Sequence, residues 1–304
     1  MLRQTLVIIL LCTLLLTACG AISPASGNLS FTDGLGREIK LDGPAQRVVS
    51  LAPSNTEVLF AIGADSQVVG RDEFSDYPEE AKSIDSVGGS MGQYSAEAIV
   101  ALKPDLVLAA EINTPELVKQ LEDLGLTVYY LKNPTTLEGM YDNLELVAQL
   151  TGHVDEANTL VESLKARVAA VDEKIAPLSS RVSVFYEIDA SDAAKPYTYG
   201  PGSFGDLLIS RAGGSNVGGS LDNAYPQISL EQLVVANPSV IVLGDSMWGT
   251  TPEAVKARPG WEGIAAVQND QIFPFDDNLI SRPGPRLVDG LEQLAKLLRP
   301  ELFK

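Results

Sequence analysis

Two segments of this chain, 134 residues apart, are alike. SAEAIVALKPDLVLAA at 95–110 aligns without a gap to SLEQLVVANPSVIVLG at 229–244. Each copy has the pattern of a serine cap, a short amphipathic helix, a proline stop and a buried strand. The spacing predicts two similar lobes rather than a solenoid, whose period would be about 20–50 residues. Chance similarity of two common helix–strand units is the alternative, and the shared Ser-x-Glu pattern argues against it. The identical pairs are Ser95/Ser229, Glu97/Glu231, Val100/Val234 and Pro104/Pro238.

Outside the repeat, short apolar strands alternate with helices. This alternation predicts an α/β fold in which each lobe has a central parallel sheet covered by helices on both faces. The expected strands are 47–52, 67–71, 106–110, 127–131, 182–188 and 271–275, together with the strand of the second repeat copy. The expected helices include 55–62, 115–124, 204–211 and 286–298.

One helix is predicted to be much longer than the rest. The segment 155–175 contains no glycine or proline and is followed by Pro177. Such a helix would form a stiff spine between two Rossmann-like lobes, with the ligand cleft between them; the alternative is that it packs on one lobe. We therefore predict an N-terminal lobe at 46–152, a helical spine at 153–178 and a C-terminal lobe at 179–304. The apolar stripe of this helix comprises Ala157, Leu160, Val161, Leu164, Val168 and Val171.

The N-terminus predicts export. Arg3 precedes an apolar run at 6–16, which is shorter than the roughly 20 residues that span a bilayer. This pattern is typical of a secretory signal. It ends in Leu-Thr-Ala-Cys19, which resembles the lipobox of bacterial lipoproteins, where cleavage precedes a cysteine that carries diacylglycerol. We expect a lipoprotein signal peptide at 1–18 and, at 19–45, a lipid-anchored tether and the start of the mature chain. An ordinary signal with a chance cysteine is the alternative.

Composition narrows the possible functions. A net charge of −18 over 304 residues argues against nucleic acid, which needs basic patches, and against a polyanion held by bulk charge. The one histidine, His153, nearly excludes the His-rich sites of zinc or manganese receptors and most metalloenzymes. It also leaves no Ser-His-Asp or Cys-His set. We therefore expect no metal site, no resident cofactor and no enzymatic activity.

Several motifs carry a family resemblance that covers both lobes. The chain from about Phe31 onward resembles the helix-spine class of substrate-binding proteins of bacterial ABC importers, which take up vitamin B12, ferric siderophores and haem. The SDYP segment followed by VGG looks most like the cobalamin branch. The matching segments are RVVSLAPSNTE at 47–57, SDYP at 75–78, VGG at 87–89, the first repeat copy, 200–205 and SRPGPR at 281–286.

The resemblance gives the repeated glutamates a role. In this family one exposed glutamate on each lobe pairs with arginines of the membrane permease, and Glu97 and Glu231 fall on those positions. Arginine recognises a carboxylate through two parallel hydrogen bonds, so two distant carboxylates on a rigid body would fix its orientation. The simpler reading is that both are acids near helix N-termini, where they favour the helix dipole.

The ligand candidates lie on loops that follow strands, where α/β proteins bind ligands. By resemblance, Phe74, Met91, Tyr197, Tyr225 and Arg282 lie at corrinoid-contacting positions. The well-known cobalamin receptor has tryptophan where this chain has Met91 and Tyr225, but methionine and tyrosine also offer apolar area to a corrin face. The complete set is Pro53, Ser54, Asn55, Phe74, Met91, Tyr94, Tyr197, Tyr199, Tyr225, Trp248, Asn278 and Arg282.

Two other ligand classes remain open. Haem would need an axial ligand, which Tyr94, Tyr197, Tyr199 or Tyr225 could supply as a tyrosinate. Ferric siderophores often call for several arginines, and those near the predicted cleft are Arg71, Arg282 and Arg286.

A different class of function is suggested by GPGSFG at 200–205, which matches the GxGxxG dinucleotide fingerprint. It lies in the second half of the chain, contains Pro201 and belongs to an exported protein, so we interpret it as a turn at the cleft mouth. The rival is a secreted enzyme that uses this loop for a phosphate-bearing cofactor.

Our interpretation is a corrinoid receptor on the extracytoplasmic side, in the periplasm or at the cell surface, held to the membrane by lipid on Cys19. Its partners would be an ABC permease dimer and its ATPase subunits.

Overall fold

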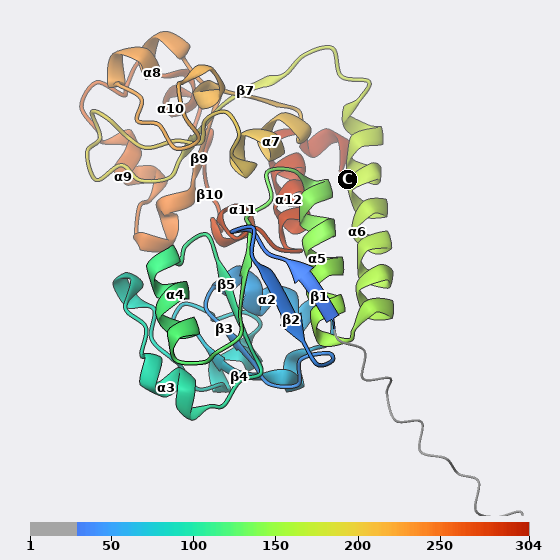
Figure 1. Ribbon diagram of the computed structural model, residues 1–304. Coiled ribbons are helices and arrows are strands. Elements are labelled where there is room, and N and C mark those ends of the chain that lie inside the picture. The colour runs from blue at the N-terminus through green and yellow to red at the C-terminus, as the bar shows by residue number, and fades with distance from the viewer. Residues whose placement is uncertain (1–28, 304) are drawn as a thin grey trace, which may run out of the picture.

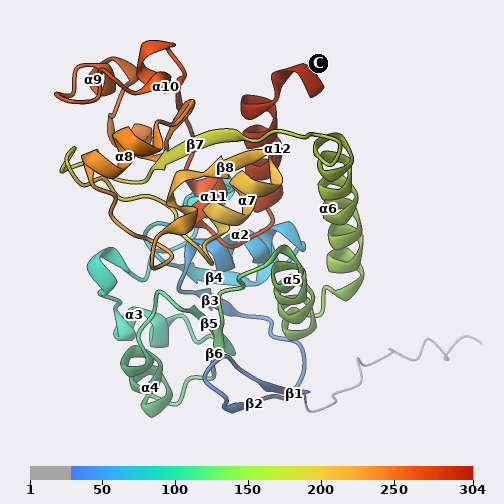
Figure 2. The ribbon, with the colours of Figure 1, turned by 90° about the horizontal axis from the view of Figure 1, so that it is seen from above.

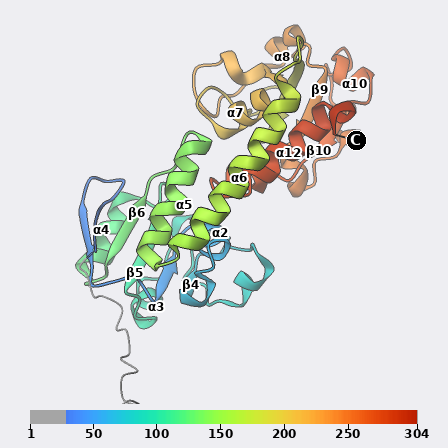
Figure 3. The ribbon, with the colours of Figure 1, turned by 90° about the vertical axis from the view of Figure 1, so that its right-hand side faces the viewer.

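The computed structural model of this chain describes residues 29–303. The predicted signal peptide and Cys19 lie outside the described residues. Two α/β lobes are joined by one long helix, α6 (Val154–Ile175), which runs along the side of both (Figures 1 and 3). This architecture confirms the predicted fold class. None of the helices in 29–303 combines the length and apolar character needed to cross a bilayer.

The N-terminal lobe has a four-stranded parallel sheet in the order β4-β3-β5-β6. Its strands are short apolar runs, of which β3, β5 and β6 are buried at every residue, as expected for a sheet covered on both faces. The strands are β3 (Val48–Ser50), β4 (Val68–Arg71), β5 (Leu106–Ala110) and β6 (Val128–Leu131). The helices are α2 (Pro53–Ala61), α3 (Ala96–Ala101), α4 (Pro115–Asp123) and α5 (Leu137–Thr151).

The C-terminal lobe repeats this topology. Its parallel sheet has the order β8-β7-β9-β10. In both lobes the second strand along the chain lies on one side of the first strand, and the third strand, followed by the fourth, lies on the other side. The strands are β7 (Val182–Glu187), β8 (Gly214–Asn216), β9 (Val240–Leu243) and β10 (Ile272–Pro274). The helices are α7 (Phe204–Arg211), α8 (Leu230–Ala236), α9 (Pro252–Lys256), α10 (Ala265–Gln268), α11 (Asn278–Ser281) and α12 (Leu287–Leu298).

The sequence repeat occupies the same place in each lobe, as the helix before the third strand. The hydroxyls of Ser95 and Ser229 cap α3 and α8 by accepting hydrogen bonds from backbone N–H groups, and each helix is followed by proline and a buried strand. The residue before that proline has a left-handed backbone in both copies, with φ of 49° at Lys103 and 46° at Asn237. The resemblance therefore extends to backbone detail, and the reading as two similar lobes is confirmed.

The long helix bridges the lobes rather than packing on one of them. Helix α6 packs against α5 of the N-terminal lobe and α12 of the C-terminal lobe, and its 22 residues span about 33 Å (Figures 2 and 3). The Arg167 guanidinium on α6 also pairs with Asp289 and Glu292 on α12. One continuous apolar core follows α6 from lobe to lobe. The buried residues of α6 are Ala157, Val161, Leu164, Val168, Val171 and Ile175.

A hairpin precedes the first lobe. Strands β1 (Leu29–Thr32) and β2 (Glu38–Leu41) pair antiparallel within the segment predicted to contain the tether and the start of the mature chain. The Tyr129 hydroxyl donates to the Thr32 carbonyl at 3.0 Å, and the Gly34 N–H donates to the Tyr130 carbonyl at 2.8 Å. The described part of this segment is therefore folded against the N-terminal lobe.

Candidate ligand-binding cleft and docking surface

An open cavity of about 310 Å³ lies between the lobes. Its N-terminal wall is formed by residues that follow β3, β5 and β6, and its C-terminal wall by the end of α11 and the turn after it. The carboxyl ends of parallel strands are where open α/β sheets bind ligands. The lining residues are Ala52, Pro53, Ser54, Ala110, Ile112, Asn133, Ser281, Arg282 and Pro283.

The start of α2 positions the N-terminal wall. Pro53 is the first residue of the helix, where its missing N–H costs nothing, and Ser54 follows it into the cavity lining. Asn55, the next predicted ligand residue, is instead buried, and its amide donates to the Leu108 carbonyl at 3.1 Å. In this structure Asn55 joins α2 to β5 and does not line the cavity.

Arg282 brings the two lobes together at the cavity. Its guanidinium pairs with Glu57 at 3.0 Å and with Asp76 at 2.7 Å, both on the N-terminal lobe, and donates to the Phe74 carbonyl at 3.3 Å. Burial acts to raise the pKa of the Asp76 carboxyl, but the hydrogen bond and charge of Arg282 lower it on balance. Arg282 therefore lines the cavity with its positive charge already compensated.

Several candidate apolar and aromatic side chains are exposed. Phe74 is exposed beside Arg282, and Ile112, which the sequence reasoning missed, is exposed in the cavity wall. Its position two residues after the strand 106–110 was the signal that could have identified it. Met91 is almost fully exposed on a turn between glycines, with its own φ at 52°. Tyr197 is exposed on the C-terminal lobe, where its backbone bridges to Asp189 and Gln227.

Two of the predicted tyrosines are held by hydrogen bonds inside the protein. The Tyr94 hydroxyl donates to the Leu51 carbonyl and accepts from the Asn113 amide, both at 2.9 Å. Burial, together with the charge of Asp72, raises the pKa of Tyr94 to about 12. Tyr199 is buried, and its hydroxyl donates to Asp277 at 2.9 Å. Neither phenol group is therefore available to a ligand in this arrangement.

The charges of carboxylates from both lobes act on Tyr225. Partial burial raises the pKa of the Tyr225 phenol, and the charges of Asp277 from one lobe and Glu111 from the other raise it further. Asp277 accepts hydrogen bonds from Tyr186 and Tyr199, yet burial raises its own pKa above the ordinary value. The cleft near Tyr225 is therefore acidic. Within residues 29–303, no three His, Cys, Asp or Glu side chains come together as a metal site would require.

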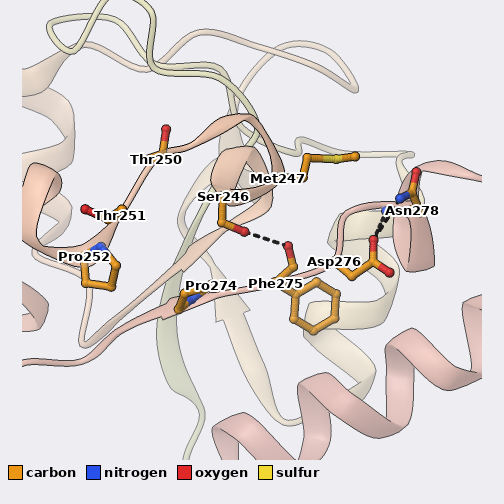
Figure 4. A pocket seen from close by; sticks show the side chains of 9 residues that line it. All are labelled: Ser246, Met247, Thr250, Thr251, Pro252, Pro274, Phe275, Asp276 and Asn278. Carbon is orange, nitrogen blue, oxygen red and sulfur yellow. Dashed lines mark hydrogen bonds between the residues drawn. The ribbon is translucent and has the colours of Figure 1, made fainter.

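Trp248 and Asn278 lie in two further pockets of the C-terminal lobe rather than in the interlobe cavity. Trp248 lines a pocket of about 580 Å³ with Asp189 and Asp245. Asn278 lines a neighbouring pocket of about 520 Å³, in which its amide donates to Asp276 at 2.9 Å (Figure 4). The structure therefore brings Pro53, Ser54 and Arg282 together in the cavity wall, with the Phe74 carbonyl bonded to Arg282, and places these two residues elsewhere.

The GxGxxG segment is a packed turn. A side chain at Gly200 would lie 2.1 Å from the Asn223 carbonyl, and one at Gly205 would lie 2.1 Å from the Tyr199 ring. The hydroxyl of Ser203 caps α7. Close packing beside Asn223 and Tyr199 thus explains Gly200 and Gly205, while Gly202 has a left-handed backbone with φ of 83°.

The repeated glutamates are both exposed. Glu97 and Glu231 each occupy the second position of a capped helix, and neither forms an ion pair with any residue in 29–303. Helices α3 and α8 lie toward opposite ends of the molecule, both on the side away from α6 (Figures 1 and 2). The two carboxylates are therefore open to a partner, and neither lines the interlobe cavity.

Comparison with known proteins agrees with this architecture. The family model described as periplasmic binding protein matches residues 48–279. An uncharacterised ABC transporter substrate-binding lipoprotein of Bacillus subtilis, YvrC, is 31% identical over 279 residues, covering 91% of this chain and 87% of that protein. The crystal structure of the periplasmic vitamin B12-binding protein BtuF of Vibrio cholerae matches with a TM-score of 0.71 and 29% identity over 86% of this chain and 99% of that one.

A haem-binding relative is equally similar in fold. The periplasmic haem-binding protein RhuT of Roseiflexus sp. RS-1 matches with a TM-score of 0.75 and 26% identity over 85% of this chain and 99% of that one. Homologues and structural neighbours are thus solute-binding proteins of one class, whose named ligands differ. On the extent of the family match and the shared two-lobed fold, the chain belongs to the periplasmic binding protein family, as a substrate-binding protein of an ABC transporter in the vitamin B12, haem and siderophore class.

Proposed function

We propose that this chain is a lipid-anchored receptor that captures a corrinoid between its lobes and delivers it to an ABC permease. The charge of the cleft is the observation that supports a corrinoid as the ligand. Arg282 and Arg286 are already paired with acids, whereas the charges of acids from both lobes act on Tyr225. A neutral ligand whose edge carries many amide N–H donors suits such a site, because carboxylates accept those hydrogen bonds.

The pairing of the cleft arginines argues against anionic cargo. Arg282 is compensated by Glu57 and Asp76, and Arg286 by Glu57. The Arg71 guanidinium donates to the backbone carbonyls of Asp72, Glu73 and Lys82. A carboxylate-bearing ligand, such as haem with its propionates, would have to displace one of these partners or meet Asp277 and Glu111.

Three of the four tyrosines considered as haem ligands also favour a corrinoid over haem. A tyrosinate ligand to iron requires an accessible phenol that loses its proton. Tyr94 and Tyr199 are engaged in internal hydrogen bonds, and the pKa of Tyr225 is raised by burial and by the acids beside it. A corrin face requires only apolar contact. Met91, Phe74 and the neutral ring of Tyr225 can provide it.

Isothermal titration of the purified chain with cyanocobalamin, cobinamide, haemin and ferrichrome tests the ligand. We expect saturable heat with cyanocobalamin or cobinamide and none with the two iron compounds. The absence of heat with both corrinoids, together with a Soret band on addition of haemin, would contradict the proposal.

To deliver its ligand, the chain would contact the permease through the ends of both lobes. Glu97 and Glu231 are unpaired, exposed and equivalent, which suits contact with a permease dimer that offers one arginine for each lobe. The lipid on Cys19 would hold the chain at the extracytoplasmic membrane surface, close to the permease and its ATPase subunits.

A further inference from the structure

Each end of the molecule also exposes an apolar residue beside its glutamate. Val100 follows Glu97 by three positions, and Val234 follows Glu231 by three, so each valine lies one helical turn from the carboxylate on the same face. The two valines are 40% and 41% exposed. Two helices in different lobes thus present the same pair of side chains, and their valines are exposed to nearly the same extent.

The fold of the lobes does not require these valines at the surface. The neighbouring residues, Ile99 and Leu233, are fully buried and already anchor α3 and α8 to the sheets. Valine is also a weak helix former, so helix propensity does not explain it at an exposed position. Within residues 29–303, no other residue covers the exposed part of either valine.

The repeat is asymmetric at one position. Val235 is 85% exposed at the position that corresponds to Ala101 in the N-terminal lobe. The C-terminal end therefore presents two adjacent valines, and the N-terminal end a valine and an alanine. We call the group Glu97, Val100 and Ala101 the N-terminal tip, and the group Glu231, Val234 and Val235 the C-terminal tip.

We propose that each tip is a composite contact for the permease, in which the glutamate meets a cation and the adjacent valines enter an apolar recess. This inference rests on the proposed docking function and extends it to the chemistry of the partner surface. Because the tips are equivalent, the partner presents two like recesses, each an arginine or lysine bordered by apolar side chains. The larger apolar area of the C-terminal tip makes its contact the stronger.

Binding of the unlipidated chain (Cys19→Ser) to right-side-out membrane vesicles, prepared from source cells that lack the native protein, tests this inference. Val100→Thr, Val234→Thr and Val235→Thr each exchange a methyl group for a hydroxyl of the same shape. We expect about three- to tenfold weaker binding for each, with Val235→Thr the most affected, and unchanged melting temperature and ligand affinity. The loss should persist at high salt, because an apolar contact is not screened.

Val154→Thr is the matched control, since Val154 is 43% exposed at the start of α6 and lies outside both tips. Glu97→Gln with Glu231→Gln is the electrostatic comparison, and its effect should shrink as salt rises. If the glutamate variant loses vesicle binding while the three threonine variants bind as wild type, docking stands and the apolar part of the contact is refuted. If neither set changes binding, the docking function itself fails and this inference fails with it.

Discussion

Arg286 of the C-terminal lobe holds Glu57 of the N-terminal lobe through two parallel hydrogen bonds, from Nε at 2.8 Å and from Nη2 at 2.5 Å. The Glu57 carboxylate is buried and also pairs with Arg282, while the Tyr77 ring stacks 3.9 Å from the Arg286 guanidinium. One carboxylate thus joins the lobes at two points of the segment 281–286. This ion network lies between the ligand cavity and the spine and restricts how far the lobes can separate.

Glu57→Gln should destabilise the fold by about 3–5 kcal/mol, because it leaves the buried Arg286 guanidinium without its charge partner and removes one of the two acids paired with Arg282. Urea unfolding followed by circular dichroism measures this loss. Lys119→Ala is the control, since it breaks the exposed pair with Asp123 and should leave the unfolding midpoint where it is. Equal midpoints for Glu57→Gln and wild type would mean that the network does not bind the lobes together.

A second buried acid predicts how stability depends on pH. Burial and the neighbouring Asp245 raise the pKa of Glu187 to about 7, although Arg258, at 2.6 and 2.8 Å, acts to lower it. Below pH 4.5, the ordinary value, Glu187 is protonated in both folded and unfolded chains. As pH rises from there through 7, the unfolded chain loses this proton first, so stability should fall by up to about 3 kcal/mol.

Glu187→Gln should flatten this part of the stability profile. The melting temperatures of wild type and variant are measured between pH 4 and 8. The difference between the two profiles reports Glu187 alone, because other acids such as Asp277 are present in both proteins. Glu253→Gln, an exposed acid in the first turn of α9, should keep the wild-type slope. Parallel profiles for wild type and Glu187→Gln would refute the assignment of the proton to this carboxyl.

The sequence was a good guide to elements whose periodicity is strong. Helix 155–175 and strand 106–110 were predicted within a residue of their observed bounds, because uninterrupted apolar patterns of period 3.6 or short buried runs leave little choice. The hairpin β1–β2 was missed because each strand has only four residues, too few for the apolar–polar alternation of LSFT and EIKL to stand out. The helix α5 was not singled out either.

The candidate site was harder to predict. Position after a strand predicts which edge of the sheet a residue occupies, but not which hydrogen bonds its side chain makes. Asn55 and Tyr199 therefore lie inside the protein, bonded to Leu108 and Asp277. The pairing of Glu57 with Arg286 joins residues more than two hundred positions apart, and no local pattern could have revealed it.

Tyr225→Ala should weaken corrinoid binding by about 1–3 kcal/mol and leave the melting temperature unchanged, because the ring is exposed and its loss opens no cavity in the core. Arg282→Ala should weaken binding and also lower the melting temperature, since Arg282 pairs with Glu57 and Asp76 of the other lobe. Calorimetry with cyanocobalamin and thermal unfolding separate these effects. Val154→Ala is the exposed apolar control, and a loss of affinity as large as that of Tyr225→Ala would discredit the assignment.

Cys19→Ser should release the chain from membranes, because the substitution removes the thiol that would carry the lipid. Partitioning into the detergent phase of Triton X-114 measures the anchor, with wild type expected in the detergent phase and the variant in the aqueous phase. Cys12→Ser lies within the predicted signal and should partition as wild type. The lipoprotein reading fails if Cys19→Ser stays in the detergent phase.

Glu97→Ala and Glu231→Ala should impair transport and leave ligand affinity nearly unchanged. Both carboxylates are exposed on helices α3 and α8, which lie toward opposite ends of the molecule, and neither lines the interlobe cavity. Loss of one partner of a charge pair weakens association by about 2–5 kcal/mol where the pair becomes buried in the complex, and by less at a wet rim. The double variant should therefore transport less than either single one, and wild-type docking should weaken as salt rises.

Uptake of labelled cobalamin by cells that carry the native permease, run beside a calorimetric titration of the purified variants, measures both quantities. Glu116→Ala and Glu253→Ala are the matched controls, because they remove exposed acids from the first turns of α4 and α9, which are not part of the repeat. Helix-dipole stabilisation is common to all four acids, so a purely structural role would affect the controls and the tips alike. Normal uptake by the double variant, or loss of its ligand affinity, would show that the repeat serves the fold of the lobes and not docking.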